Sequence, residues 1–334
     1  METVKLKDIA EKTGFSISTI SRILSGDPSR KMKEETIKTV LRTADEMGYY
    51  KARKNKLRKS IPEIRLLSLY METQNEGRTV YPSILEGITE EVRSIQATTR
   101  LEHETLSNTA GKLDEKLSST KYDAAILVGK ADGETLDLLR SNVSCIIHVG
   151  LNPMDDMDEV ICDFRDMIRH GYTYLRGMGR KNIAYIGSAY RGSQAYIGFL
   201  EGMIASGDDV DDVVAIDSTS TTLDGYESAE MLLEGKKPDA ILTTNDSIAI
   251  GVMKALKSRN IDCPEEIAVI GCGNLETSAY LETSLSTFDI PSRELGKASV
   301  KVCMERLENP WSGHIRVELP STFIERESTH RKDR

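Results

Sequence analysis

From residue 64 onward, short apolar runs alternate with longer amphipathic stretches, and this alternation is the strongest constraint on the fold. The runs that we predict to be strands are 64–70, 123–129, 144–150, 182–188, 212–217, 239–245 and 266–272. Amphipathic periodicity predicts helices at 82–95, 164–178, 192–206, 225–233, 247–258 and 292–307. Strands that alternate with helices in this way are typical of parallel sheets with helices on both faces. The sequence therefore predicts an α/β core of two doubly wound, parallel-sheet lobes.

The first fifty residues lack this alternation and instead predict three short helices. Apolar residues that can pack the first two helices together stand at Ile9, Ala10, Ile20, Ile23 and Leu24. Gly14 follows the first helix, where a left-handed residue would end it, and Ser16 can cap the second. A third helix is predicted at 34–47. Two short helices joined by a tight turn predict an all-α helix-turn-helix head, a motif that places its second helix in the major groove of DNA.

The net charge of −9 conceals an uneven distribution of charge along the chain. Residues 1–60 carry 15 lysines and arginines against 8 acidic residues, a local charge of +7. The remainder carries 29 against 45, a local charge of −16. A basic head attracts phosphate groups and an acidic core repels them, so binding to double-stranded DNA is directed to the head. A solvated basic tail is the alternative, but a tail would not carry the apolar spacing of packed helices.

The sequence also argues against several classes of site and location. No apolar run approaches the roughly 20 residues of a membrane span, and no signal-peptide pattern opens the chain. Five scattered cysteines form no C-x-x-C pair, and the five histidines show no metal-ligand spacing. We find no nucleophile-elbow, phosphate-loop or zinc-protease motif. We therefore expect a cytoplasmic protein that has no cofactor, metal ion, membrane partner or enzymatic activity.

Four segments resemble the lactose/galactose repressor (LacI/GalR) family of transcriptional regulators. They are LKDIAEKTGFSISTISRIL (6–24), HGYTYLRGMGRKNIAYIG (170–187), PDAILTTNDSIAIGVMKAL (238–256) and IPSRELGKASVKVCMERL (290–307). The likeness covers essentially the whole chain, and the head looks most similar to the evolved-β-galactosidase and galactose operon repressors. The resemblance implies a periplasmic-binding-protein-like core and a repressor of a carbohydrate-utilisation operon. It also implies a homodimer that binds a near-palindromic operator and is released by a small-molecule effector, a sugar such as galactose or a β-galactoside.

The same resemblance divides the chain into three parts. The expected boundaries are a helix-turn-helix head at 1–50, a hinge at 51–61 and an effector-binding and dimerisation core at 62–334. Within this core, lobe 1 is expected at about 62–160 and 290–318, and lobe 2 at about 161–289 and 319–334.

The second helix of the head supplies the residues that we expect to read the operator. Arg22 suits a bidentate contact with guanine, because its fork matches the O6/N7 pair. By resemblance, Ile17 and Ser18 set the choice of operator, with Ile17 pressing on a thymine methyl group. The residues expected to hold the DNA backbone are Ser16, Thr19, Ser21, Lys31 and Lys33. Leu57, in the basic hinge, matches the leucine that the family wedges into the minor groove, and packing on the core is its alternative role.

Resemblance also implies which residues line the effector cleft. They are Tyr81, Asp163, Asn245 and Asp246. The last two equally suit the cap of the helix that follows them. Two family residues that grip sugar hydroxyls are absent, because Ala195 and Gly273 stand at their positions. Arg191 is a candidate substitute for the missing arginine.

These departures leave alternatives to induction by a sugar. Within the same class of protein, the effector is a co-repressor, or the cleft is degenerate and binds no ligand. A sugar-binding transport protein is the alternative from a different class, and the added helix-turn-helix head argues against it.

Overall fold

The computed structural model describes residues 5–25, 34–47, 49, 63–71, 80–95, 99–106, 110–189, 192–218, 221–235, 237–310 and 313–330. The chain divides near residue 64 into two compact units. The first unit contains the predicted helix-turn-helix, and we call it the head. The second contains two sheets with their helices, and we call it the core.

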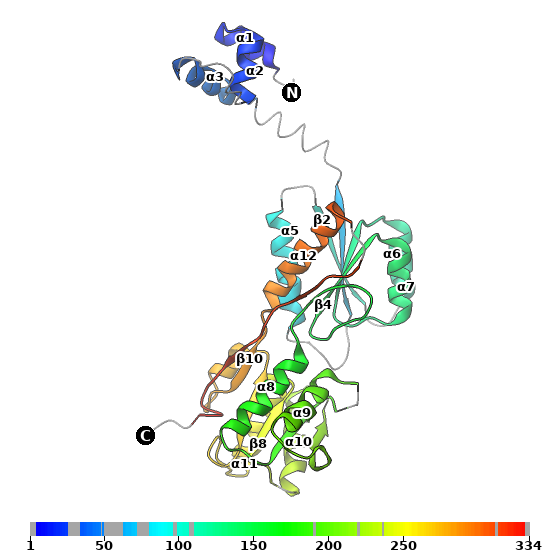
Figure 1. Ribbon diagram of the computed structural model, residues 1–334, viewed down its shortest axis with the longest axis vertical. Coiled ribbons are helices and arrows are strands. Elements are labelled where there is room, and N and C mark those ends of the chain that lie inside the picture. Colours follow the sequence, from blue (N-terminus) through cyan, green and yellow to red (C-terminus); the bar gives the residue numbers. More distant parts are fainter. Residues whose placement is uncertain are drawn as a thin grey trace. The chain divides into compact units, whose positions relative to one another are not determined.

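The head consists of helices α1 (Leu6–Thr13), α2 (Ile17–Ser25) and α3 (Glu34–Glu46), as Figure 1 shows. The buried apolar residues that hold them together are Ile9, Ile20, Val40, Ala44 and Tyr49. Gly14 ends α1 with φ at 75°, a left-handed conformation that glycine adopts without steric cost. The backbone N–H of Thr19 donates to Ser16 Oγ over 3.2 Å, so this hydroxyl caps α2. The turn and the cap that the sequence predicts are both confirmed.

The first sheet of the core defines lobe 1. Its strands are β1 (Ile64–Met71), β2 (Thr99–Leu106), β3 (Ala124–Val128), β4 (Cys145–Gly150), β5 (Asp158–Ile161) and β11 (Arg316–Glu318). They lie in the order β11-β5-β4-β3-β1-β2, and the pairs from β11 to β1 are parallel. Helices α5 (Tyr81–Ser94) and α12 (Ser292–Glu308) pack together on one side of the sheet, and α6 (Ala110–Ser119) and α7 (Gly133–Asn142) on the other (Figure 1). Parallel strands covered on both faces confirm the doubly wound prediction for this lobe.

The second sheet defines lobe 2. Its strands are β6 (Ile183–Gly187), β7 (Val214–Asp217), β8 (Ala240–Thr243), β9 (Ala268–Cys272), β10 (Ser286–Asp289) and β12 (Thr322–Ile324). Their order is β12-β10-β9-β8-β6-β7, and all pairs are parallel except that β12 is antiparallel to β10. Helix α8 (Phe164–Gly177) packs against α9 (Gln194–Ala205), and α10 (Thr222–Glu234) packs against α11 (Asp246–Ser258). A short 3-10 turn, η2 (Glu276–Ala279), follows β9.

Several elements of the core are not apparent from the sequence pattern. They are β2, β5, β10, β11, β12, α6 and α7. Strands β5, β10, β11 and β12 have only three or four residues each, too few for a periodic pattern to stand out. Strand β2 lies at the edge of its sheet and carries charged residues such as Arg100, Glu102 and Glu104. Its sequence therefore lacks the apolar run by which the other strands were predicted. Helices α6 and α7 bury only a narrow apolar stripe, so they resemble polar loops in the sequence.

The chain passes between the two lobes at three described positions. Strand β5 leads into α8 of lobe 2, β10 leads back into α12 of lobe 1, and β11 leads into β12 of lobe 2. In doubly wound folds, ligands bind where the carboxyl ends of the parallel strands meet the loops that follow them.

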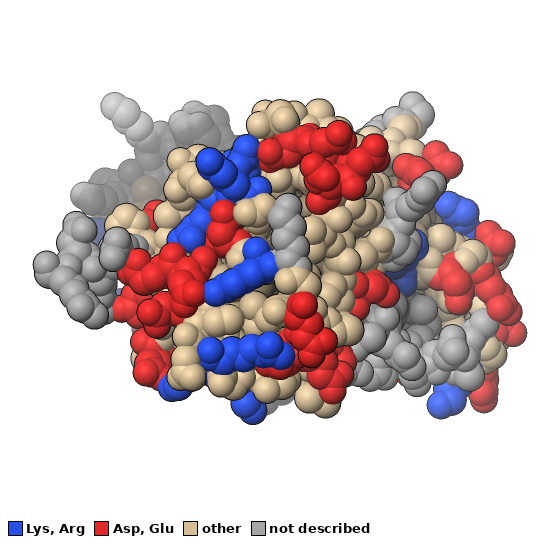
Figure 2. Space-filling model, turned by 90° about the horizontal axis from the view of Figure 1, so that it is seen from below, with Lys and Arg blue, Asp and Glu red and all other residues tan. Residues whose placement is uncertain are grey.

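Acidic side chains cover more of the face in Figure 2 than basic ones do, in line with the negative charge of the core sequence. Among the helices that the structure describes, none is long and apolar enough to span a membrane.

Candidate functional site

Helix α2 turns its apolar side toward the interior of the head and its polar side outward. Ile20 is fully buried and anchors the helix. The predicted DNA-contacting residues that are exposed are Ser16, Ile17, Ser18, Ser21 and Arg22, and Thr19 is half-buried. Ile17 leaves 49% of its surface exposed, although it is a large apolar residue in a packed helix. The structure thus exposes five of these six residues at the surface of the head and leaves Thr19 partly covered.

The start of α2 is also a cluster of hydroxyl groups. Ser16 Oγ lies 2.8 Å from Ser18 Oγ and 2.9 Å from Thr19 Oγ1. Hydroxyls and free backbone N–H groups at a helix start are suitable partners for a phosphate group. The other three predicted DNA-contacting residues, Lys31, Lys33 and Leu57, lie outside the described residues.

A cavity of about 70 Å³ lies where residues of both lobes meet at the ends of their strands, and we call it the cleft cavity. Its lining comprises Tyr81, Gly129, Lys130, His148, Leu151, Asn152, Pro153, Met154, Gly192 and Gln194. The predicted residue Tyr81 is 3% exposed, and its ring packs edge-to-face on Tyr70 with 5.5 Å between centroids. Gly129 has φ at 84°, and a Cβ there would lie 3.2 Å from Tyr81 Cζ, so the turn after β3 requires glycine.

His148 lines the same cavity and is not among the residues predicted from the sequence. It lies in β4 and is 2% exposed, with Nδ1 3.5 Å from Glu159 Oε2 in the neighbouring strand β5. Burial alone would raise the pKa of the Glu159 carboxyl, but contacts with His148, the Met154 N–H and Arg316 lower that pKa below its usual range. The available sequence signal was a lone titratable residue within the apolar run CIIHVG.

Asp163 and Asn245 each cap a helix of lobe 2. Asp163 Oδ1 accepts the backbone N–H groups of Arg165 and Asp166 at the start of α8. Asn245 Oδ1 accepts the backbone N–H of Ile248 over 2.8 Å at the start of α11. The capping role that the sequence offered for Asn245 is therefore present. Neither residue is part of the lining of the cleft cavity.

Asp246 points into lobe 2 and is 1% exposed. Its carboxylate accepts three hydrogen bonds, from the Leu275 N–H, the Ser278 hydroxyl and the Thr287 hydroxyl, over 2.6–2.7 Å. Burial raises the pKa of this carboxyl despite these hydrogen bonds, which act to lower it. Because its carboxylate oxygens already face donors of its own chain, Asp246 shapes the edge of the lobe and does not present a free carboxylate.

Ala195 and Gly273 stand where the family has residues that bind sugar hydroxyls. Ala195 is 2% exposed in the first turn of α9. Gly273 has φ at 119°, in the region that favours glycine. Its neighbour Asn274 donates to Asp289 Oδ1 over 3.1 Å and accepts from Arg326 over 2.7 Å. Arg191, the candidate substitute for the arginine, lies outside the described residues.

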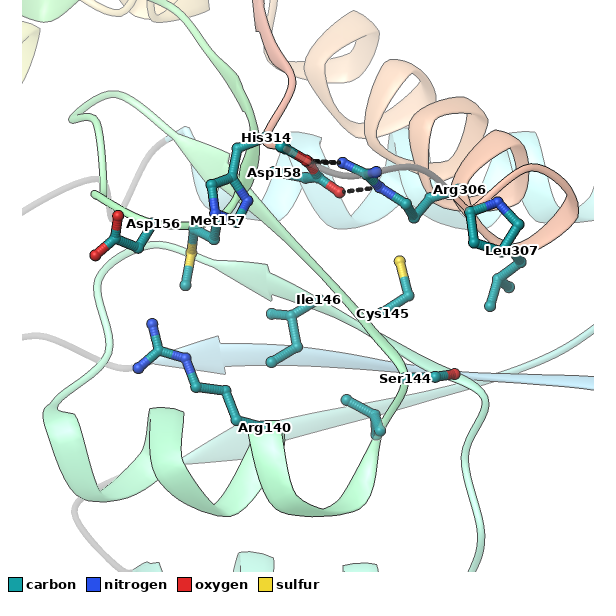
Figure 3. Close-up of a pocket in the computed structure, with 13 residues that line it drawn as sticks. Arg140, Ser144, Cys145, Ile146, Asp156, Met157, Asp158, Arg306, Leu307 and His314 are labelled. Carbon is teal, nitrogen blue, oxygen red and sulfur yellow. Dashed lines mark hydrogen bonds and ion pairs between the residues drawn. The ribbon is translucent and has the colours of Figure 1, made fainter.

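A larger cavity of about 570 Å³ lies at the opposite, amino end of β4 and β5 (Figure 3). Arg306 of α12 donates from Nε to Asp158 Oδ2 over 2.6 Å, and both residues line this cavity. Burial would raise the pKa of Asp158, but Arg306 and the Ile315 N–H lower that pKa below its usual range. Cys145 borders the same space and is buried. Across the described part of the chain, no group of His, Cys, Asp and Glu residues is placed to hold a metal ion.

Two family models match this chain. The model for bacterial regulatory proteins of the lacI family matches residues 5–51, the helix-turn-helix head. The model for a periplasmic binding protein-like domain matches residues 172–329 of the core. The chain thus combines a LacI-family helix-turn-helix domain with a periplasmic-binding-protein-like domain.

A relative of this chain is the HTH-type transcriptional repressor MelR of Bacillus subtilis (strain 168). The two are 28% identical over 345 residues, which cover 97% of each chain. This relative is a transcriptional repressor and not an enzyme, and the present chain carries the DNA-binding domain of such a regulator, as predicted.

Solved structures show the same LacI-type fold. The transcriptional regulator CelR–cellobiose complex superposes with a TM-score of 0.68 at 19% identity, covering 97% of this chain and 99% of that one. The lac repressor dimer bound to operator and the anti-inducer ONPF also gives 0.68 at 19% identity, covering 98% and 99%. A helical head followed by two parallel-dominated lobes is thus the architecture that this chain shares with them.

Proposed function

We propose that this regulator represses a carbohydrate-utilisation operon by binding a near-palindromic operator as a homodimer, and that a sugar releases it. The observation that carries the proposal is the outer side of α2, where Ile17, Ser18, Ser21 and Arg22 are exposed on a helix anchored by Ile20. A recognition helix needs this arrangement, because its side chains must reach base edges while the helix stays fixed. The proposed site of action is the cytoplasm, where the operator DNA lies.

Each DNA-facing residue has a proposed contact. Arg22 binds guanine through two parallel hydrogen bonds, Ile17 contacts a thymine methyl group and Ser18 adds a weaker base contact. The residues proposed to hold the DNA backbone are Ser16, Thr19, Ser21, Lys31 and Lys33. Leu57 is proposed to enter the minor groove, where an apolar wedge kinks DNA. The proposed division remains a head at 1–50, a hinge at 51–61 and a core at 62–334.

A homodimer is proposed because one head reads too few base pairs for a specific operator. The related lac repressor was solved as a dimer on its operator. In this chain, α10 exposes Leu223 at 64% and Met231 at 57%, and Tyr280, next to η2, is 81% exposed. We propose that these exposed apolar residues lie in the surface that the second copy of the chain covers.

The effector is proposed to bind at the cleft cavity and the adjoining edge of lobe 2. Tyr81 lines the cavity directly, and Asp163, Arg191 and Asn245 are proposed to contact the parts of the ligand that extend beyond it. Asp246 is proposed to support this edge from within lobe 2. The CelR structure holds cellobiose, which supports a carbohydrate in a fold of this kind. The effector acts only if its affinity differs between the operator-binding state and the released state.

Fluorescence anisotropy of a labelled operator from the DNA upstream of the gene tests the proposal. Sugars including galactose and lactose are added in turn at fixed salt, because phosphate contacts make the affinity depend on salt. We expect one sugar to weaken binding about tenfold or more, a coupling of roughly 1.4 kcal/mol. Tighter binding with a sugar would instead show co-repression. Tight operator binding that no carbohydrate changes would show that the cleft is silent, in line with Ala195 and Gly273.

A further inference from the structure

The two ring nitrogens of His148 have different surroundings. The side chain lies in β4 and is 2% exposed, yet it lines the cleft cavity. Nδ1 is enclosed by the protein and lies 3.5 Å from Glu159 Oε2 in β5. Within the described part of the chain, no hydrogen bond uses Nε2. A buried polar atom without a partner in its own chain indicates a partner supplied by a ligand, because native structures seldom leave such atoms unpaired.

Two glycines keep Nε2 accessible from the cavity. A Cβ at Gly150, two residues along β4, would lie 3.2 Å from Nε2, closer than most side-chain contacts. The same Cβ would lie 3.8 Å from the Cα of Gly129, which lines the cavity. A glycine within a strand often marks a place that a ligand approaches closely. Nε2 is therefore on the side of the ring that faces the cavity, and a side chain at position 150 would crowd it.

Glu159 determines which ring nitrogen carries the proton. Burial acts to raise the pKa of this carboxyl, but contacts with His148, the Met154 N–H and Arg316 lower that pKa below its usual range, so the group is ionised near neutrality. A proton on Nδ1 faces the carboxylate, whereas a proton on Nε2 would leave the Nδ1 lone pair against it, which is repulsive. In the neutral imidazole with its proton on Nδ1, Nε2 is a hydrogen-bond acceptor.

The same carboxylate fixes the loop that follows β4. The backbone N–H of Met154 donates to Glu159 Oε2 over 2.8 Å, and Arg316 of β11 pairs with Oε1. Met154 lines the cleft cavity, as His148 does. Glu159 is thus a positioning residue, which holds both the imidazole ring and part of the loop in place at the cavity.

The rest of the described lining suits an uncharged partner for Nε2. It contains no carboxylate, and Lys130 is exposed at its rim. Asn152 of lobe 1 and Gln194 of lobe 2 bring amide groups, which both donate and accept. A carboxylate or phosphate group would place its lone pairs against that of Nε2, and an ammonium group would find no carboxylate to balance its charge. A hydroxyl group can donate to Nε2 and accept from an amide at the same time.

We infer that His148 determines the specificity of the effector site, and that its Nε2 accepts a hydrogen bond from a hydroxyl group of a neutral sugar. This inference rests on the proposed function of the cleft as the effector site. The cavity of about 70 Å³ has room for about five water molecules, so it takes one edge of a sugar ring. The rest of the ligand extends toward the edge of lobe 2. This contact from lobe 1 offsets the loss of hydroxyl-binding residues at positions 195 and 273.

Sugars that lack one hydroxyl group test this contact by titration calorimetry on the full chain. The probes are galactose, glucose, lactose and cellobiose, followed by the monodeoxy derivatives of each one that binds. We expect the removal of one particular hydroxyl group to weaken binding about tenfold, the loss of one enclosed hydrogen bond.

Variants assign this hydroxyl group to His148. His148→Phe keeps a ring and removes the acceptor, so it should weaken the parent sugar about tenfold. It should bind the derivative that lacks the particular hydroxyl group as tightly as the unaltered chain does, whereas a disturbed fold would weaken all the sugars alike. His148→Gln keeps an acceptor near the Nε2 position and should lose less. His103→Phe, the same substitution at an exposed residue of β2 outside the cavity, is the matched control and should bind normally.

Two further measurements leave His148 in place. Gly150→Ala crowds Nε2 with a methyl group and should weaken the parent sugar as His148→Phe does. Nitrogen NMR of the full chain with its five histidines labelled should show an Nε2 without a proton, whose signal shifts when the sugar is added and is missing from His148→Phe. A proton on Nε2, or a signal that the bound sugar does not change, would overturn the inference.

The outcomes separate the inference from the proposed function. Equal losses for the parent sugar and all its derivatives in His148→Phe would overturn the inference, while release of the operator by that sugar would still support the proposed function. The expected pattern of losses without any change in operator affinity would support the inference and contradict release by a sugar. Binding of none of the four parent sugars would overturn the inference.

Discussion

Thr287 in β10 donates from Oγ1 to Asp246 Oδ1 over 2.6 Å, and this hydrogen bond joins β10 to the start of α11. The other oxygen of Asp246 accepts from Leu275 and Ser278 in the loop after β9. Gly271 approaches so closely that a Cβ at that position would collide with this carboxylate. One buried side chain therefore holds three segments of lobe 2 that are distant in sequence. Asn245, its neighbour, caps α11 by accepting the backbone N–H of Ile248.

Replacing Asp246 should cost far more stability than replacing Asn245. Asp246→Ala leaves three donors without their acceptor and should lower the free energy of unfolding by about 3–5 kcal/mol. Asn245→Ala removes a helix cap and should cost about 1 kcal/mol. Urea denaturation followed by circular dichroism measures both. Similar small losses for the two variants would show that the Asp246 network contributes little to lobe 2.

Arg22 should determine operator specificity. Arg22→Ala should weaken operator binding by about 1–3 kcal/mol, the value of one bidentate contact with guanine, and should leave effector binding intact. Non-specific DNA should be affected much less. Arg42→Ala, at an exposed position of α3 in the same head, is the control that removes one positive charge outside α2. An operator affinity unchanged in Arg22→Ala, measured by anisotropy at fixed salt, would refute the assignment of α2 as the recognition helix.

The proposed dimer surface can be disrupted by a single charge. Tyr280→Glu places a carboxylate at an exposed residue that we assign, with Leu223 and Met231, to the dimer interface, and should shift the chain from dimer to monomer. Sedimentation equilibrium measures the mass, and operator affinity should fall with it. Ile204→Glu alters a residue of α9 that is 64% exposed, and serves as the control that keeps the dimer. Dissociation by Ile204→Glu but not by Tyr280→Glu would move the interface to α9.

Stability toward acid should depend on two carboxylates of lobe 1. The pKa values of Asp158 and Glu159 are lowered by their contacts with Arg306 and with His148 and Arg316, although burial acts in the opposite direction. The unfolded chain then binds more protons than the folded chain at low pH, so this stability is present near neutrality and is lost below about pH 4. Asp158→Asn should lower stability at pH 7 and flatten its loss toward pH 3.

Urea midpoints across this pH range measure the effect. Asp156→Asn is the control, because Asp156 borders the same cavity but is exposed. If Asp158→Asn kept the stability and the acid sensitivity of the unaltered chain, the ion pair with Arg306 would contribute nothing to the folded state.

Local patterns in the sequence were sufficient to predict the head and most elements of the core. The spacing of Ile9, Ile20 and Val40 places them on facing helix surfaces whatever the rest of the chain does, and Gly14 and Ser16 act within one turn of their own position. Alternating apolar and amphipathic runs likewise determined the parallel lobes. Short strands such as β5 and β12 escaped prediction, because their pairing comes from neighbours in the sheet and not from a pattern of their own.

Contacts between residues that are distant in sequence determine the environments of Asp246 and His148. The donors to Asp246 lie 29, 32 and 41 residues away from it, so no local pattern could show that this carboxylate is already occupied. His148 becomes a candidate ligand contact only because β4 and β5 pair in parallel and place Glu159 beside it, while the cleft cavity opens on its other side. The sequence by itself determined the class of protein, since helices and strands follow from local spacing. The chemistry of the cleft was decided by tertiary structure, since burial and hydrogen-bond partners exist only once the chain has folded.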